Sequence, residues 1–71
     1  MFEGSMKLTE REIEVLKLIV SENSSADIAS YLNISVKSVE SCASSLKSKT
    51  GARNKAELIV FAVKNGYAEI L

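Results

Sequence analysis

Apolar residues recur along the chain at helical spacing in several separate stretches. Ile13, Leu16 and Val20 lie three or four positions apart, which places them on one face of a helix. The chain contains no Pro and three Gly among 71 residues, so little in it would interrupt helices. The pattern predicts an all-α fold with four helices, over about residues 9–22, 24–32, 35–50 and 54–65.

Capping residues support these boundaries. A Thr, Ser or Asn followed three residues later by an acidic residue is the signature of a helix start, because each side chain bonds a backbone N–H of the first turn. This signature occurs at Thr9 with Glu12, Ser24 with Asp27 and Asn54 with Glu57, and Ser35 caps the third helix. Residues that tolerate the left-handed backbone region end the helices at Asn33, Gly51 and Gly66.

The third predicted helix has one apolar face and one polar face. Val39, Ala43, Leu46 and Thr50 share an arc of the helical wheel, with Cys42 at its edge. A short helix followed by a tight turn and an amphipathic helix is the helix-turn-helix pattern. Because such a protruding helix fits the major groove, the pattern favours DNA binding. The opposite arc carries Lys37, Glu40, Ser41, Ser44, Lys47 and Ser48.

The fourth predicted helix contains the longest apolar run of the chain, residues 58–63. Its apolar residues spread around the wheel, so one helix of a small domain cannot bury them all. The surplus face predicts a contact with a second subunit or a neighbouring domain. The alternative, equally weighted, is that the tail from Tyr67 to Leu71 folds back over it. The residues of the surplus face are Ile59, Val60 and Val63.

Charge divides the chain into two halves although its formal net charge is zero. Three basic and six acidic residues precede Ser35, whereas six basic and three acidic residues follow from there on. A basic second half fits a nucleic-acid partner. The ordinary interpretation, solvated helix faces, stays open.

The length fits one domain. The chain has one Cys and no His, so an intramolecular disulfide, a Cys/His zinc site and His-dependent catalysis are impossible. We therefore expect no metal, no cofactor and no enzyme. A lone Cys suits a reducing cytoplasm, and no stretch reaches the ~18 apolar residues of a membrane span. We expect Cys42 to be a small, partly buried filler rather than a reactive thiol, and Tyr31 and Tyr67 to lie at the core edge.

Three stretches carry a resemblance to a known family. Residues 8–16, LTEREIEVL, match the Leu-Thr-x-Arg-Glu-x-Glu-Val-Leu opening of the LuxR/GerE/NarL-type helix-turn-helix domain. Ala26-Asp-Ile-Ala, with Leu32 and the segment 34–39, resembles its central block, and residues 51–58, GARNKAEL, resemble its ending. The resemblance covers about residues 8–67. We take residues 7–71 as this domain and residues 1–6 as a disordered or cloning-derived leader.

The resemblance implies a DNA-binding domain of a bacterial transcription regulator, in a family that includes response regulators. Such domains usually follow an N-terminal receiver or sensor domain and dimerise through the fourth helix, here with Ile59, Val60 and Val63 at the interface. The partner would be double-stranded DNA. By position in the motif, the base-facing residues would be Lys37, Glu40, Ser41 and Ser44, and the phosphate contacts Ser35, Ser38, Lys47, Lys49 and Arg53.

The chain departs from the family pattern on the DNA-facing helix. The family commonly has a basic residue at the position of Glu40 and His at that of Cys42, and it often has Lys where Ala26 stands. A carboxylate is repelled by phosphates, but it can accept a hydrogen bond from cytosine N4. Two interpretations stay open: Glu40 reads a cytosine in a dimeric DNA-binding domain, or the domain binds DNA weakly or not at all and modulates another regulator as a protein-interaction module.

Overall fold

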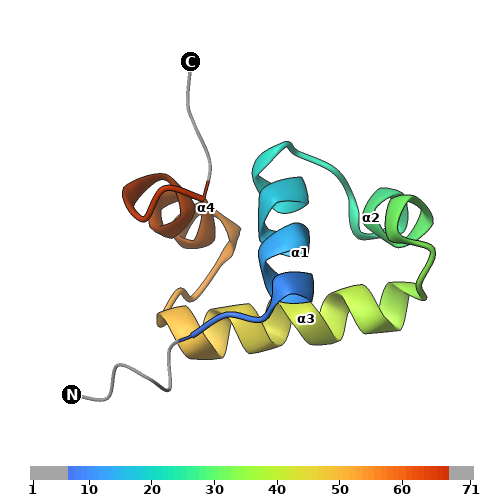
Figure 1. The fold of residues 1–71 in the computed structure, drawn as a ribbon, viewed down its shortest axis with the longest axis horizontal. Helices are drawn as coiled ribbons and strands as arrows, with labels where there is room; N and C mark the ends of the chain where they lie inside the picture. Colours follow the sequence, from blue (N-terminus) through green and yellow to red (C-terminus); the bar gives the residue numbers. More distant parts are fainter. Residues whose placement is uncertain (1–6, 68–71) are drawn as a thin grey trace.

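The computed structural model describes residues 7–67, and these residues form four helices and no strand (Figure 1). The all-α prediction is therefore confirmed, with each helix starting one residue after its predicted capping residue. The predicted leader 1–6 and the last residues of the predicted domain, 68–71, lie outside the described residues. The helices are α1 (Glu10–Val20), α2 (Ser25–Leu32), α3 (Val36–Thr50) and α4 (Lys55–Lys64).

The predicted capping interactions are present at the helix starts. At α1, the Thr9 hydroxyl oxygen accepts from the Glu12 N–H at 3.1 Å, and the Glu12 carboxylate accepts from the Thr9 N–H at 2.9 Å. Ser24 and Asp27 form the same reciprocal pair at α2. At α4 the Asn54 side chain accepts from the Glu57 N–H at 2.9 Å. Local sequence therefore determines where these helices begin.

A tight turn joins α2 to α3 and completes the helix-turn-helix. Asn33 ends α2 in the left-handed conformation, with φ 60° and ψ 46°, as predicted. The Ile34 N–H donates to the Ala29 carbonyl at 2.9 Å, which closes the end of α2. Ala29 is buried, and its small side chain lets the two helices meet closely at this corner.

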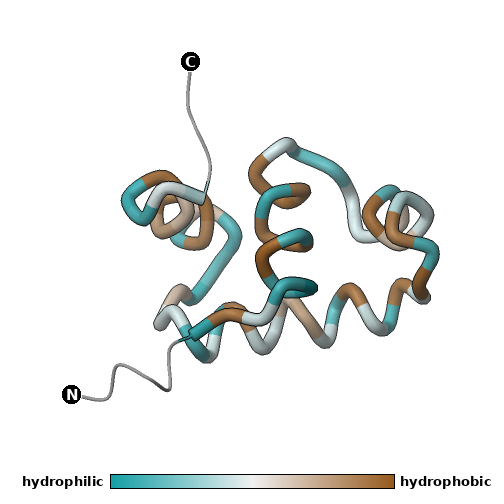
Figure 2. The backbone as a smooth tube through the Cα atoms, in the orientation of Figure 1, coloured by the Kyte–Doolittle hydropathy of each residue, from teal (hydrophilic) through white to brown (hydrophobic). Residues whose placement is uncertain are grey.

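All four helices contribute to one core. Figure 2 shows hydrophobic and hydrophilic positions interleaved along each helix, as expected of amphipathic helices. α1 packs against α3 and α4, and α2 packs against α3. Because α3 contacts each of the other helices, the core fixes its orientation. The largest fully buried side chains are Leu16, Ile28, Leu46, Leu58, Val15 and Val39.

The two tyrosines differ in their positions. Tyr67 packs against the core and stacks on Phe61, with ring centroids 6.1 Å apart, as predicted for a core-edge aromatic. The same prediction is wrong for Tyr31, which is 78% exposed. The short helix α2 turns Ile28 and Ala29 into the core, and this leaves Tyr31 outside the buried arc. Cys42 is half-buried and packs against the core, as expected of a filler.

Candidate nucleic-acid interface

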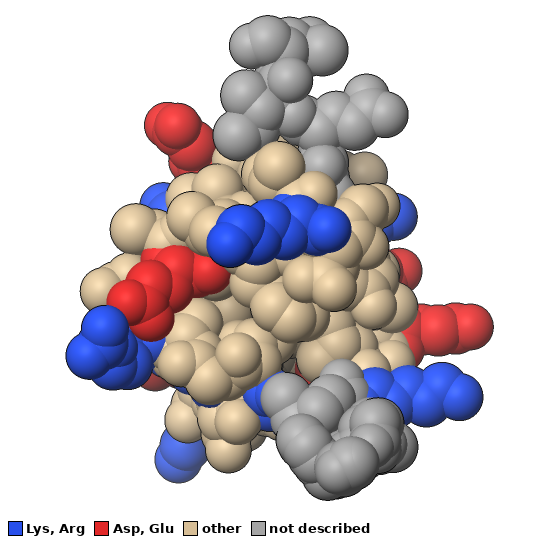
Figure 3. Space-filling view, turned by 90° about the vertical axis from the view of Figure 1, so that its left-hand side faces the viewer, with Lys and Arg blue, Asp and Glu red and all other residues tan. Residues whose placement is uncertain are grey.

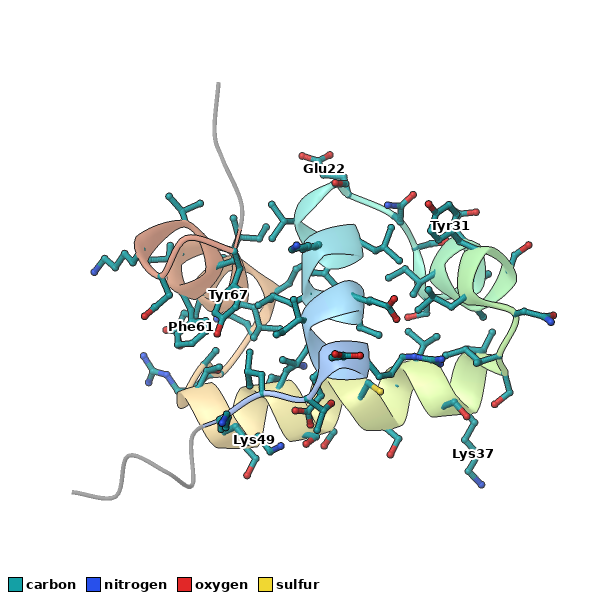
Figure 4. All side chains as sticks on the ribbon, in the orientation of Figure 1. Glu22, Tyr31, Lys37, Lys49, Phe61 and Tyr67 are labelled. Atoms are coloured by element: carbon teal, nitrogen blue, oxygen red, sulfur yellow. The ribbon has the colours of Figure 1, made fainter. Side chains whose placement is uncertain are left out.

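The side of α3 that points away from the bundle is the candidate interface. α1, α2 and α4 all lie on one side of α3 in Figure 1, and no other described element covers its opposite side. Figure 4 shows Lys37 pointing away from the bundle on that side. Because the core residues Val39 and Leu46 anchor the inner face, the polar face is held outward. All four residues predicted to face bases are exposed: Lys37, Glu40, Ser41 and Ser44.

Two serines organise the first turn of α3. The Ser35 hydroxyl oxygen accepts from the Ser38 N–H at 3.0 Å, so Ser35 is the N-cap, as predicted. The Ser35 hydroxyl also donates to the Ser38 hydroxyl oxygen at 3.0 Å. Ser38 accepts in this pair, so its own hydroxyl hydrogen can donate outward. Ser35 and Ser38, two of the predicted phosphate contacts, therefore lie exposed at the start of α3.

Glu12 anchors α3 to α1, a role that sequence reasoning missed. Its side chain is buried, and its carboxylate accepts from the Lys49 ammonium at 2.8 Å and from the Ser45 hydroxyl at 2.6 Å. Together with the Thr9 N–H, these hydrogen bonds lower the pKa of Glu12 to about 2. The sequence assigned Glu12 a capping role alone, because its partners on α3 are 33 and 37 residues away.

Lys49 and Arg53, both predicted phosphate contacts, are engaged in ion pairs. The Lys49 ammonium lies between Glu12 and the Lys7 carbonyl, on the side of α3 that meets α1. The Arg53 guanidinium contacts the Glu57 carboxylate at 3.1 Å, and this pair raises the pKa of Arg53. The Arg53 pair is exposed, and exposed pairs exchange readily with other anions. The Lys49 pair is more enclosed. It therefore holds Lys49 away from the exposed polar face of α3.

A shallow hollow of about 210 Å³ lies beside α3 at the first turns of α2 and α4. Its lining is mainly apolar, and its rim carries two lysines. None of its lining residues is acidic. Such a rim favours an anion such as a phosphate group. Of the residues that line this hollow, the sequence predicts only Lys47 as a phosphate contact. The lining residues are Ile19, Asn23, Ser24, Ser25, Ala43, Lys47, Lys55 and Leu58.

The outer face of α4 is the second candidate surface. Leu58 and Ala62 are buried against the core, whereas Val60 is 50% exposed and Ile59 and Val63 are half-buried. Figure 3 looks at this side and shows a surface that is uncharged over much of its area, with a basic side chain across its upper part and acidic and basic side chains toward its left edge. The first residue of the tail, Tyr67, covers Phe61 rather than Val60, and the rest of the predicted covering tail lies outside the described residues.

Residues 7–67 contain no group of three or more His, Cys, Asp or Glu side chains placed to hold a metal ion. Of the helices in this part of the chain, none has the length and apolarity that crossing a membrane requires. A second hollow, lined by Glu14, Lys17, Leu18, Tyr31 and Leu32, lies between α1 and α2, away from the outward face of α3.

Comparison with known proteins identifies the family. The model of the bacterial regulatory proteins of the luxR family, GerE, matches residues 6–62. The chain belongs to the LuxR family. The resemblance inferred from the three sequence blocks is thus confirmed, and so is the expectation of a regulator rather than an enzyme, because this is a family of regulatory proteins.

Curated relatives agree with this assignment. The chain is 43% identical over 60 residues to "Probable transcriptional regulator ycf29" of Cyanophora paradoxa, covering 84% of this chain and 29% of that protein. It is 37% identical over 62 residues to "Oxygen regulatory protein NreC" of Staphylococcus aureus, covering 87% of this chain and 29% of that protein. The chain therefore spans less than a third of the length of either relative. No solved structure matches the chain.

Proposed function

We propose that the chain is the DNA-binding domain of a bacterial transcription regulator and that α3 enters the major groove of double-stranded DNA. The observation that carries this proposal is the outward polar face of α3, with every other described helix on the opposite side. A helix held in this way can enter the groove without a clash from its own domain. The residues that would face base edges are Lys37, Glu40, Ser41 and Ser44.

Phosphate contacts would lie on both sides of these base-facing residues. The hydroxyl groups of Ser35 and Ser38 lie at the start of α3, and Lys47 lies on the rim of the hollow near its end. Arg53 can exchange its exposed carboxylate partner for a phosphate. Lys49 would contribute least, because it would have to leave the enclosed carboxylate of Glu12.

Glu40 would select bases rather than supply affinity. Its carboxylate can accept a hydrogen bond from cytosine N4–H in the major groove, but it is repelled by the phosphates around it. Affinity would then come from pairing two domains on two half-sites, through the outer face of α4. Ile59, Val60 and Val63 would form that interface, and two linked modules bind more tightly than one.

The whole regulator would contain a further domain. The relatives are more than three times as long as the matched segment, which leaves room for an N-terminal receiver or sensor domain. The full protein would act in the cytoplasm, where a bacterial transcription regulator meets the chromosome.

Titration of the domain with random-sequence and genomic duplexes across a range of salt concentrations tests this proposal. We expect the logarithm of the binding constant to fall linearly with the logarithm of salt concentration. Lys47→Ala should reduce that slope by about one, whereas Lys17→Ala, which removes an exposed charge from α1, should leave it unchanged. Flat titrations at every salt concentration would overturn the proposal.

A second candidate is a protein-interaction module that modulates another regulator. Glu40 favours it, because an exposed carboxylate among serines is a poor surface for phosphates. Glu40→Lys separates the two candidates. If the unmodified domain does not bind DNA and the variant does, the interaction module is supported. If both bind with different sequence preferences, the DNA-binding function is supported.

A further inference from the structure

We infer that Val36 is a specificity-determining residue that contacts the 5-methyl group of a thymine in the major groove. This inference rests on the proposed function. Val36 is the first residue of α3, and it is 41% exposed. The other large apolar side chains that are exposed among residues 7–67, Tyr31 and Val60, lie on α2 and α4. Val36 is therefore the one that α3 would present to DNA.

The position of Val36 places it with the proposed base-facing residues. It lies four residues before Glu40, so the two side chains are neighbours on the helix surface. In a helix-turn-helix, residues in the N-terminal part of the recognition helix contact base edges. Four residues advance about 6 Å along the axis, compared with about 3.4 Å for a base pair. The thymine would therefore lie within about two base pairs of the cytosine that Glu40 reads.

The chemistry of the side chain selects the methyl group. Among the standard bases, thymine alone presents a methyl group in the major groove, and the other groups that distinguish the bases there are hydrogen-bond donors and acceptors. Val36 has neither, whereas Glu40, its neighbour on the helix surface, and Lys37, the next residue of the chain, are both charged. The Ser35–Ser38 cap fixes the start of the helix, and a β-branched side chain in a helix keeps nearly one rotamer. Val36 is thus a rigid apolar contact, which suits it for reading a methyl group.

Replacing thymine with deoxyuridine tests this contact, because the change removes only the methyl group. Duplexes are first selected from a random pool with the unmodified domain, and each thymine is then replaced in turn. We expect a position in each half-site where uracil weakens binding about fourfold, the amount that corresponds to one buried methyl group. In Val36→Ala, thymine and uracil at that position should bind equally. Tyr31→Ala, an exposed apolar residue on α2, should keep the discrimination.

The outcomes separate this inference from the function on which it rests. If the unmodified domain shows no salt-dependent DNA binding, the proposed function fails and the inference fails with it. If DNA binds but no thymine is sensitive to uracil, or if Val36→Ala keeps the sensitivity, the inference alone is overturned. Thermal melting by circular dichroism checks that each variant is folded. Sensitivity that is lost in Val36→Ala, at a thymine within about two base pairs of the cytosine affected by Glu40→Gln, supports the contact.

Discussion

Glu12 joins three parts of the chain through one carboxylate. It caps α1 through Thr9 and holds two side chains of α3, Ser45 and Lys49. All of its partners favour the charged form, and the carboxyl group therefore has a pKa of about 2 instead of 4.5. A group whose pKa is lower in the folded state stabilises the fold above its unfolded pKa, and this contribution is lost as the pH falls toward the folded pKa.

The first prediction is that Glu12→Gln removes an acid-sensitive part of the stability. At pH 7 we expect the variant to be about 2 kcal/mol less stable, because the amide keeps the size of the side chain but not the charge that Lys49 and Ser45 contact. Since the lost contribution disappears between about pH 4.5 and pH 2, the two proteins should converge over that range. Urea denaturation at several pH values measures the difference.

Glu14→Gln is the matched control for this change. Glu14 lies on the same helix, but its contact with Arg11 is exposed on both sides, so its loss should change stability by a few tenths of a kcal/mol. A stability difference between Glu12→Gln and the unmodified protein that is the same at pH 2.5 and pH 7 would contradict the proposed role of the carboxylate.

At the scale of the helices, the sequence predicts those features that depend on residues close together in the chain. The starts of α1 and α2 follow from side chains three residues apart, and the end of α2 follows from an Asn that tolerates the left-handed region. The inner face of α3 follows from its apolar spacing. The bond between Ser45 and Glu12 joins residues 33 positions apart, so no local pattern contains it. The hollow that brings Lys47 and Lys55 together likewise depends on how α2, α3 and α4 pack together.

The connection between α1 and α2 contains a conformation that the sequence does not reveal. Glu22 has φ 65°, a left-handed backbone that a side chain with a Cβ atom adopts at a cost of about 1–2 kcal/mol. Its N–H donates to the Ile19 carbonyl at 2.9 Å, and the Asn23 N–H donates to Leu18 at 3.3 Å. These bonds close the end of α1, and they hold Glu22 in a conformation that Gly adopts without strain.

The second prediction is that Glu22→Gly stabilises the domain. The strain removed from the folded backbone should exceed the free-energy cost of a more flexible unfolded chain. The unfolding free energy should therefore rise by about 0.5–1 kcal/mol. Glu22→Ala removes the same exposed side chain but keeps a Cβ atom, so it should show no such gain. Thermal and urea denaturation of the two variants measure the effect. A Gly variant that is less stable than the Ala variant by about 0.4–1 kcal/mol, the cost of the more flexible unfolded chain alone, would show that the backbone here carries no strain.

At the scale of the whole molecule, two surfaces point in different directions. The outward face of α3 is polar and lies opposite the rest of the bundle, whereas the outer face of α4 is mainly uncharged and lies at the end of the molecule (Figures 1 and 3). A second domain bound to α4 would therefore leave α3 uncovered. This separation allows one surface to pair subunits while the other contacts DNA, as two half-sites require.

The third prediction is that Val60→Glu weakens self-association without unfolding the domain. Val60 is half-exposed, so a carboxylate there remains solvated in the monomer, but it would be buried without a partner in a dimer formed through α4. We expect sedimentation to show a shift toward monomer and thermal melting at low protein concentration to change little. Binding to a duplex with two half-sites should fall by at least tenfold, and binding to a single half-site should not.

Tyr31→Glu is the matched control, because it places the same charge at a more exposed apolar position on a different helix. If dimers form through α4, this variant should keep the self-association and the two-site binding of the unmodified domain. If both variants lose association equally, added negative charge rather than the α4 surface is responsible. If the unmodified domain stays monomeric at high concentration, the proposed dimer is contradicted. In that case the affinity that Glu40 does not supply would have to come from a part of the regulator outside this domain, for which the greater length of the relatives leaves room.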